Sequence, residues 1–243
     1  MLPSKIVSQE EWIAARRALL EKEKAHMRAG DVLAAERRTL PWVKVEKPYM
    51  FDTTSGPKRL PELFGHCDQL IVHHFMYAPE WEAGCPSCSY QAEHIDGPAQ
   101  HLEQRGVRII AISSAPLKKL LAYRARMGWR FDWVSSGGSD FNQDFRVTFS
   151  EAEVAAGRVD YNFGTITTEP RYVSRELPGI SVFYKNEAGE VFHTYSTYAR
   201  GLDALLGIHH YLDLTPEGRD KARHPNWPRR HDEYDKPAPP RER

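Results

Sequence analysis

The residues best suited to chemistry are the two cysteines of one short segment, Cys85-Pro86-Ser87-Cys88. Two thiols at this spacing can exchange with disulfides, or they can bind a metal ion as thiolates. The chain holds three cysteines, the third being Cys67, which is too few for the disulfide framework of a small secreted domain. The Cys-x-x-Cys spacing therefore favours redox or metal chemistry over a structural disulfide.

The sequence around this segment predicts the elements that position it. Residues 70–77 form a nearly continuous apolar run, typical of a central strand covered on both faces. A helix is expected from Cys88 to about residue 104, with a break at Gly97-Pro98, and residues 107–113 predict the next strand. Strand, helix and strand indicate a parallel βαβ unit with the cysteines just beyond the carboxyl end of its first strand.

This position predicts a different role for each cysteine. Cys85 is expected at the N-cap of the helix and Pro86 at an early helical position, where its missing N–H costs nothing. Unpaired N–H groups and the helix dipole stabilise a thiolate at that end, so Cys85 should be the attacking sulfur. Cys88, one turn inside the helix, should resolve the mixed disulfide by intramolecular attack.

The rest of the chain predicts an α/β protein with an arm and a tail. Residues 1–40 are expected to form an N-terminal helical arm that starts with a capping box at Ser8 and Glu11 and has a break near Gly30. Residues 41–215 are expected to form the main domain, with a preliminary hairpin before the core and a long insertion at 135–177. Residues 216–243 are Pro- and Arg-rich and are expected to be a mobile tail.

Further elements are predicted after the βαβ unit. They are a helix at 117–127, a strand at 129–134, an antiparallel hairpin at 180–184 and 191–195, and a helix at 201–212.

This order resembles the thioredoxin fold, and the chain is similar to an uncharacterised thioredoxin-like family whose members are described as predicted dithiol–disulfide oxidoreductases. The similarity covers nearly the whole chain. The matching stretches are AERRTLPW (35–42), HFM (74–76), GCPSCS (84–89), MGWRF (127–131), GSDFN (138–142), SVFY (181–184) and HTYS (193–196).

The resemblance implies a three-layer α/β/α fold and a thiol–disulfide oxidoreductase. No cofactor or resident metal is expected. Its partners would be a disulfide-bearing protein or a small thiol substrate, together with an electron donor. Thioredoxins also keep a buried acid near the resolving thiol. We expect the imidazole of His74 to take that role, with a hydrogen-bonded core histidine as the alternative.

Two further features follow from the resemblance and its departures. Thioredoxins place a cis-proline opposite the disulfide, and Pro178 lies near that point; the alternative is a trans proline that enters an edge strand. Gly84 stands where thioredoxins have tryptophan, so substrate recognition should differ. Tyr77, Trp81 and Trp129 are candidates for an apolar substrate-binding rim beside Cys85, with core packing as the alternative.

Three other functions stay open. The cysteines could hold zinc or copper together with Cys67 or with His66, His74 or His94, although no second Cys-x-x-Cys is present. A peroxiredoxin-like thiol peroxidase would carry Thr or Ser three residues before its reactive cysteine, where this chain has Glu82. The third alternative is a non-catalytic thioredoxin-fold binding protein.

Composition and charge argue against a nucleic-acid-binding protein and against a membrane protein. Thirty-three basic residues balance thirty-three acidic ones, so no bulk charge favours nucleic acid or an anionic membrane surface. No window approaches the roughly 18 apolar residues of a spanning helix. The N-terminus lacks an export signal, and we expect a cytoplasmic protein whose N-terminal arm is a candidate homodimer element.

Overall fold

The computed structural model describes residues 5–165, 175–219, 224 and 227–237. The chain divides into two compact units, residues 1–41 and 42–243. Among the described residues, no helix is long and apolar enough to cross a membrane.

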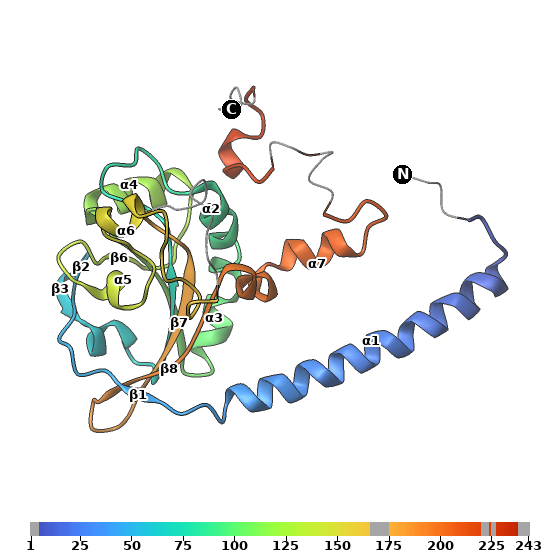
Figure 1. Ribbon diagram of the computed structural model, residues 1–243, viewed down its shortest axis with the longest axis horizontal. Coiled ribbons are helices and arrows are strands. Elements are labelled where there is room, and N and C mark those ends of the chain that lie inside the picture. The colour runs from blue at the N-terminus through green and yellow to red at the C-terminus, as the bar shows by residue number, and fades with distance from the viewer. Residues whose placement is uncertain (1–4, 166–174, 220–223, 225–226, 238–243) are drawn as a thin grey trace. The chain divides into compact units, whose positions relative to one another are not determined.

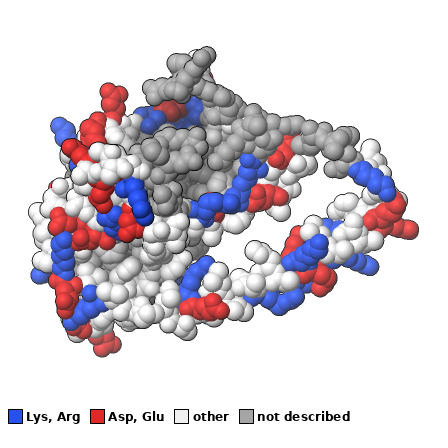
Figure 2. All heavy atoms as spheres, in the orientation of Figure 1, with Lys and Arg blue, Asp and Glu red and all other residues white. Residues whose placement is uncertain are grey.

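The first unit is one helix, α1 (Gln9–Arg37), shown in blue in Figure 1. Its N-terminus carries the predicted capping box: the Ser8 hydroxyl accepts from the Glu11 N–H at 3.2 Å, and the Glu11 carboxylate accepts from the Ser8 N–H at 3.0 Å. The helix continues through Gly30 without the expected break, and none of its residues is buried. Basic and acidic side chains are interspersed along it (Figure 2).

The second unit is built on one eight-stranded sheet with the order β1-β8-β7-β4-β5-β6-β2-β3. The strands are β1 (Val43–Lys44), β2 (Met50–Thr53), β3 (Gly56–Arg59), β4 (Gln69–His74), β5 (Val107–Ser113), β6 (Trp133–Ser135), β7 (Gly179–Lys185) and β8 (Val191–Tyr198). Strands β4, β5 and β6 are parallel, and β7 runs antiparallel to both β4 and β8. The central strands therefore form the predicted βαβ unit, followed by the predicted hairpin.

Helices cover both faces of this sheet (Figure 1). On one face, α2 (Pro86–Ala92), α3 (Asp96–Glu103) and α4 (Leu117–Arg126) follow β4 and β5. On the other face lie the 3₁₀ helix η1 (Leu60–Phe64) and α5 (Phe141–Asp144). The chain continues through α6 (Glu151–Ala155), η3 (Ala199–Leu205), α7 (Gly207–Asp213) and η4 (His231–Glu233). This is a thioredoxin-like α/β/α arrangement, with the predicted preliminary hairpin formed by β2 and β3.

The side-chain alternation of the strands separates two buried clusters. Leu70 and Val72 of β4 pack with Ile110 and Ile112 of β5 under η1 and α5. Phe75, Tyr77 and Trp133 pack on the opposite face with α2 and α4, and Cys88 belongs to this second cluster. The dithiol therefore lies on the α2 and α4 face of the sheet.

Candidate active site

Cys85 caps the helix that follows the central strand. Its N–H donates to the Met76 carbonyl at 3.1 Å, which anchors the loop after β4. Its own carbonyl accepts from both the N–H and the hydroxyl of Ser89, each at 2.9 Å. Pro86 occupies the first turn of α2, as the sequence predicts. These bonds fix the direction in which the Cys85 side chain leaves the helix.

The two thiols are free and differ in exposure. Cys85 is half-buried, whereas Cys88 is 1% exposed. The Cys88 thiol donates a hydrogen bond to the Cys85 sulfur and, with the N–H groups of Ser87 and Cys88, lowers the pKa of Cys85 to about 6, although burial opposes this effect. Burial raises the pKa of Cys88 well above its ordinary value, and the adjoining Cys85 raises it further. The pair therefore holds one thiolate and one thiol near neutrality.

Gly84 allows the loop to approach the aromatic cluster. A Cβ at this position would lie 2.6 Å from the Phe75 ring and 3.0 Å from the Tyr123 ring. Both rings are buried, so they have little room to move. A glycine in front of Cys85 is therefore a packing requirement.

A second polar layer supports the Cys85 backbone. The Ser89 hydroxyl is hydrogen-bonded to the Tyr123 hydroxyl at 2.8 Å, and Arg230 donates from Nε to that same tyrosine oxygen at 2.9 Å. Arg230 also donates to the Gly84 carbonyl at 3.1 Å from Nε and 2.7 Å from Nη2. The charge of Arg230 is a further cause of the low Cys85 pKa. Sequence reasoning missed this arginine because it lies in the segment expected to be a mobile tail.

A buried carboxyl group also acts on the dithiol. Glu176 is 2% exposed, and its Oε1 accepts from the hydroxyls of Ser114 at 2.7 Å and Thr148 at 3.1 Å. Burial raises the pKa of Glu176 to about 7, although those two hydrogen bonds oppose the shift. The Glu176 charge in turn raises the pKa of Cys88. This residue falls within the predicted insertion, where no local pattern singled it out.

The structure places His74 on the opposite face from the cysteines. Its ring stacks on Phe141 and Phe145, at centroid distances of 5.6 and 5.9 Å, and its Nε2 is hydrogen-bonded to the Ser181 hydroxyl at 2.8 Å. Ser181 continues through Ser196, with 2.8 Å between the hydroxyls. The structure does not bring His74 to the dithiol, because side chains alternate along β4 and Phe75 takes the Cys88 face.

His73, on the dithiol face, is fully buried next to Phe75. Gln91 lies beside it, but neither ring nitrogen has a partner of normal hydrogen-bond geometry among the described residues. Burial lowers the pKa of His73 to about 3, so the ring is neutral at ordinary pH.

Pro178 lines a cavity beside the dithiol. This cavity has a volume of about 460 Å³, and its walls include Ser87, Cys88, Pro178, His209, Trp227 and Pro228. Among the described residues the cis peptide bond is Trp227–Pro228, so the bond before Pro178 is trans. The resemblance to thioredoxin had implied a cis bond there.

The three aromatic residues predicted as a rim are placed differently from one another. Tyr77 is 1% exposed, and its hydroxyl donates to the Glu82 carbonyl at 3.1 Å. Trp129 is buried against Phe75 and Phe131. Trp81 is half-buried and packs against the edge of the same cluster. Of the three, Trp81 offers the most surface to a substrate.

Cys67 and the dithiol lie at opposite ends of β4. Cys67 precedes the strand and is buried, and burial raises its pKa. The six residues of β4 separate it from the loop that carries Cys85 by about 20 Å. Cys67 and its neighbour His66 are therefore too far away to complete a metal site with the dithiol. In the part of the chain that the structure describes, no group of three or more His, Cys, Asp or Glu side chains is placed to hold a metal ion.

Fold and site together define a thioredoxin-like protein with a Cys-x-x-Cys pair at the start of α2. The chain belongs to the family described as "Bacterial protein of unknown function (DUF899)", which matches residues 1–234. Comparison with curated proteins finds no match.

Solved structures similar to this chain include several peroxiredoxins. Peroxiredoxin Q of Xanthomonas campestris is 13% identical with a TM-score of 0.46, over 70% of this chain and 95% of that one. Peroxidoxin BcpB from Mycobacterium tuberculosis is 14% identical with a TM-score of 0.45, over 69% and 94%. The mitochondrial 2-Cys peroxiredoxin from Plasmodium falciparum is 14% identical with a TM-score of 0.39, over 70% and 92%.

Proposed function

We propose that this protein is a thiol–disulfide oxidoreductase in which Cys85 attacks and Cys88 resolves. The observation that carries the proposal is the asymmetry of the pair. Cys85 is half-buried with a pKa lowered to about 6, and Cys88 is buried with a raised pKa. A thiolate is the nucleophile in disulfide exchange, so at neutral pH Cys85 is ready to react while Cys88 keeps its proton.

The reaction takes place in two exchanges. The Cys85 thiolate attacks one sulfur of a substrate disulfide, forms a mixed disulfide and releases the other sulfur as a thiolate. Cys88 then loses its proton and attacks the Cys85 sulfur, which releases the second substrate thiolate and leaves a Cys85–Cys88 disulfide. Two electrons pass from the dithiol to the substrate. A second thiol compound, the electron donor, restores the dithiol by the reverse exchange.

Glu176 is the group we propose to take the proton from Cys88. Its pKa is raised to about 7, so it exchanges protons near neutrality, and its charge acts on Cys88. The Ser114 and Thr148 hydroxyls that donate to its Oε1 hold the carboxyl group in place. This role was predicted for His74, which instead lies among Phe141 and Phe145.

The cavity of about 460 Å³ supports a substrate site next to the pair. Its lining includes Cys88, Pro178, Trp227 and Pro228. Its size suits a small disulfide or a short extended segment of a protein. We therefore propose a disulfide-bearing protein or a small thiol compound as the substrate class.

The test is a redox titration of the full chain in glutathione buffers, with thiol alkylation and mass spectrometry at each potential. We expect one two-electron transition of the Cys85–Cys88 pair between roughly −120 and −270 mV. Cys85→Ser should abolish the transition and the catalysed reduction of a model disulfide. Cys88→Ser should trap a mixed disulfide on Cys85.

Cys67→Ser is the matched control, because this buried cysteine lies at the other end of β4. It should leave the transition unchanged. Total metal is measured on the same samples. Stoichiometric metal held by thiols that resist alkylation, or a pair that stays reduced across the whole range, would contradict the proposal.

A further inference from the structure

The segment 227–236, here called the C-terminal strap, lies against the loop that carries Cys85. Its residue Arg230 donates two hydrogen bonds to the Gly84 carbonyl and one to the Tyr123 hydroxyl. Tyr123 is in turn bonded to Ser89, whose hydroxyl donates to the Cys85 carbonyl. Arg230 thus contacts Gly84, the residue before Cys85. It also contacts Tyr123, which is hydrogen-bonded to the serine that supports the Cys85 backbone.

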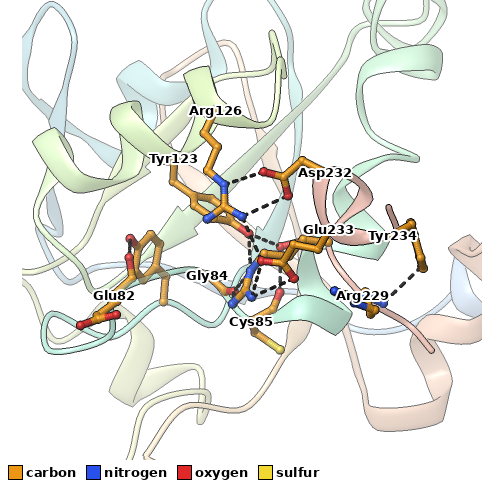
Figure 3. A network of polar contacts seen from close by, with 12 residues as sticks. Glu82, Gly84, Cys85, Tyr123, Arg126, Arg229, Asp232, Glu233 and Tyr234 are labelled. Carbon is orange, nitrogen blue, oxygen red and sulfur yellow. Dashed lines mark hydrogen bonds and ion pairs between the residues drawn. The ribbon is translucent and has the colours of Figure 1, made fainter. Parts of the chain in front are cut away.

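Ion pairs attach the strap to the helices on this face. Arg126 of α4 donates to Asp232 at 2.7 and 3.0 Å and to Glu233 at 3.0 Å (Figure 3). Glu233 also pairs with Arg230 at 3.2 Å. The side chains of Arg230 and Glu233 are only 18% and 23% exposed, so these pairs are better shielded than ordinary surface pairs.

His231 adds a third attachment, with its Nδ1 2.6 Å from Glu93 at the end of α2. The strap therefore contacts α2, α4 and the loop between β4 and α2.

We propose that Arg230 is a positioning residue for the Cys85 thiolate, and that docking of the C-terminal strap completes the reactive site. The inference rests on the proposed role of Cys85 as the attacking thiol. A carbonyl oxygen next to a thiolate is a repelling dipole, and the guanidinium of Arg230 neutralises it by binding the Gly84 oxygen through two N–H groups. The same cation favours the charged form of the neighbouring thiol.

The charged and titratable groups around the pair come from every element packed there. On the loop after β4 they are Tyr77 and Glu82, on the helices Cys88, Tyr123 and Arg126, before β7 Glu176, and on the strap Arg230, Asp232 and Glu233. His73 of β4 and Tyr161 also lie on this side, and the cavity that Cys88 lines holds Tyr90, Arg200, Asp203, His209 and Arg219. The carboxylates of Asp232 and Glu233 are neutralised by Arg126 and Arg230. Arg230 is the charge of the strap that acts on the Cys85 sulfur.

The test is the rate at which iodoacetamide alkylates Cys85 in the reduced full chain, measured against pH by site-resolved mass spectrometry. For Arg230→Gln we expect the midpoint to move to higher pH. Near pH 6, where the Cys85 pKa lies, the rate should fall about threefold. Well above that pH it should match the wild type, because Cys85 is then ionised in the variant and in the wild type alike. Arg230→Lys keeps the charge and a donor and should restore most of the profile.

Arg229→Gln is the matched control. This neighbouring arginine donates within the strap, to the Lys236 carbonyl at 2.9 Å, and its loss removes the same charge from the same segment. It should leave the profile of Cys85 unchanged. An equal shift in Arg229→Gln and Arg230→Gln would overturn the proposal, because the effect would then be one of net charge.

A second variant keeps the test decisive if Arg230→Gln does not fold. Asp232→Asn weakens the attachment to Arg126 and leaves Arg230 intact, and it should move the midpoint in the same direction by a smaller amount. Profiles identical to the wild type in every folded strap variant would overturn the inference about Arg230 while disulfide exchange continued. If Arg230→Gln shifts the alkylation profile as expected but the wild type catalyses no disulfide exchange, the inference about Arg230 stands and the proposed function is rejected.

Discussion

Glu176 has an ionisable side chain where charge is costly, since it is 2% exposed, and its Oε1 accepts from the hydroxyls of Ser114 and Thr148. Its pKa is raised from 4.5 to about 7 in the folded chain. Folding therefore favours the protonated form. Below pH 4.5 the Glu176 carboxyl group is protonated in both the folded and the unfolded chain, so it costs the folded state no stability. As the pH rises toward 7, the unfolded chain ionises first and the folded state loses relative stability.

Glu176→Gln should remove this loss. The amide oxygen of glutamine can accept the same two hydroxyls, so the packing is kept. In urea unfolding, the stability of the variant relative to the wild type should increase between pH 5 and pH 8, by at most about 3 kcal/mol. Glu187→Gln, on the exposed turn between β7 and β8, is the control and should show no such trend. A constant difference at all pH values would contradict the assignment of the raised pKa to Glu176.

At the scale of elements, the loop from β4 to α2 determines where Cys85 sits. Gly84→Ala places a methyl group 2.6 Å from the buried Phe75 ring. We expect a loss of about 1–3 kcal/mol in the free energy of unfolding, because the ring is packed on all sides. Urea unfolding measures this loss. Gly138→Ala has no atom within 4 Å of its new Cβ, so it should change stability much less. Equal costs at both positions would show that the loop relaxes freely.

The elements with strong apolar patterns were predictable. Residues 107–113 form β5 as expected, because an apolar run there follows a glycine turn. The run at 70–77 forms β4 only to His74. Phe75 and Tyr77 extend the apolar run, but they belong to a loop that packs against α4. An apolar run indicates burial, and burial alone does not distinguish a strand from a packed loop. The predicted helix from Cys88 is two helices, which separate before Gly97.

The place of the cysteines at the start of α2 was predictable, because it depends on neighbours in the sequence. Glu176 and Arg230 were not, since tertiary contacts bring them to the dithiol from segments without apolar periodicity. Ion pairs with α4 and hydrogen bonds to the loop before α2 hold the strap, and such contacts leave no repeating pattern in a sequence. Of the predicted insertion, residues 166–174 lie outside the described residues.

At the scale of the whole molecule, the two units have different sources of stability. No residue of α1 is buried, whereas residues 42–243 contain the sheet and its clusters. At a protein concentration low enough to keep both forms monomeric, a chain without residues 1–41 should therefore unfold in urea with nearly the same midpoint and slope as the full chain, because little surface is buried by α1 within one chain. A clear fall in either value would show that α1 contributes to the core.

The full chain and the chain without residues 1–41 also test the predicted homodimer. Trp12, Leu19 and Leu33 of α1 are exposed apolar side chains. Light scattering on the full chain and on residues 42–243 should give a dimer for the first and a monomer for the second. A full chain that stays monomeric at high concentration would contradict the predicted dimer.

The aromatic cluster around Cys88 makes the protein a reporter of its own redox state. Trp129 and Trp133 are buried in the cluster that contains Cys88, with their ring centroids 5.9 Å apart. An excited indole loses its emission when it transfers an electron to a nearby disulfide, whereas thiols quench it less. Oxidation of the pair should therefore dim the intrinsic tryptophan fluorescence, and Cys88→Ser should abolish the change. The redox state of the Cys85–Cys88 pair could then be followed optically in the unlabelled protein.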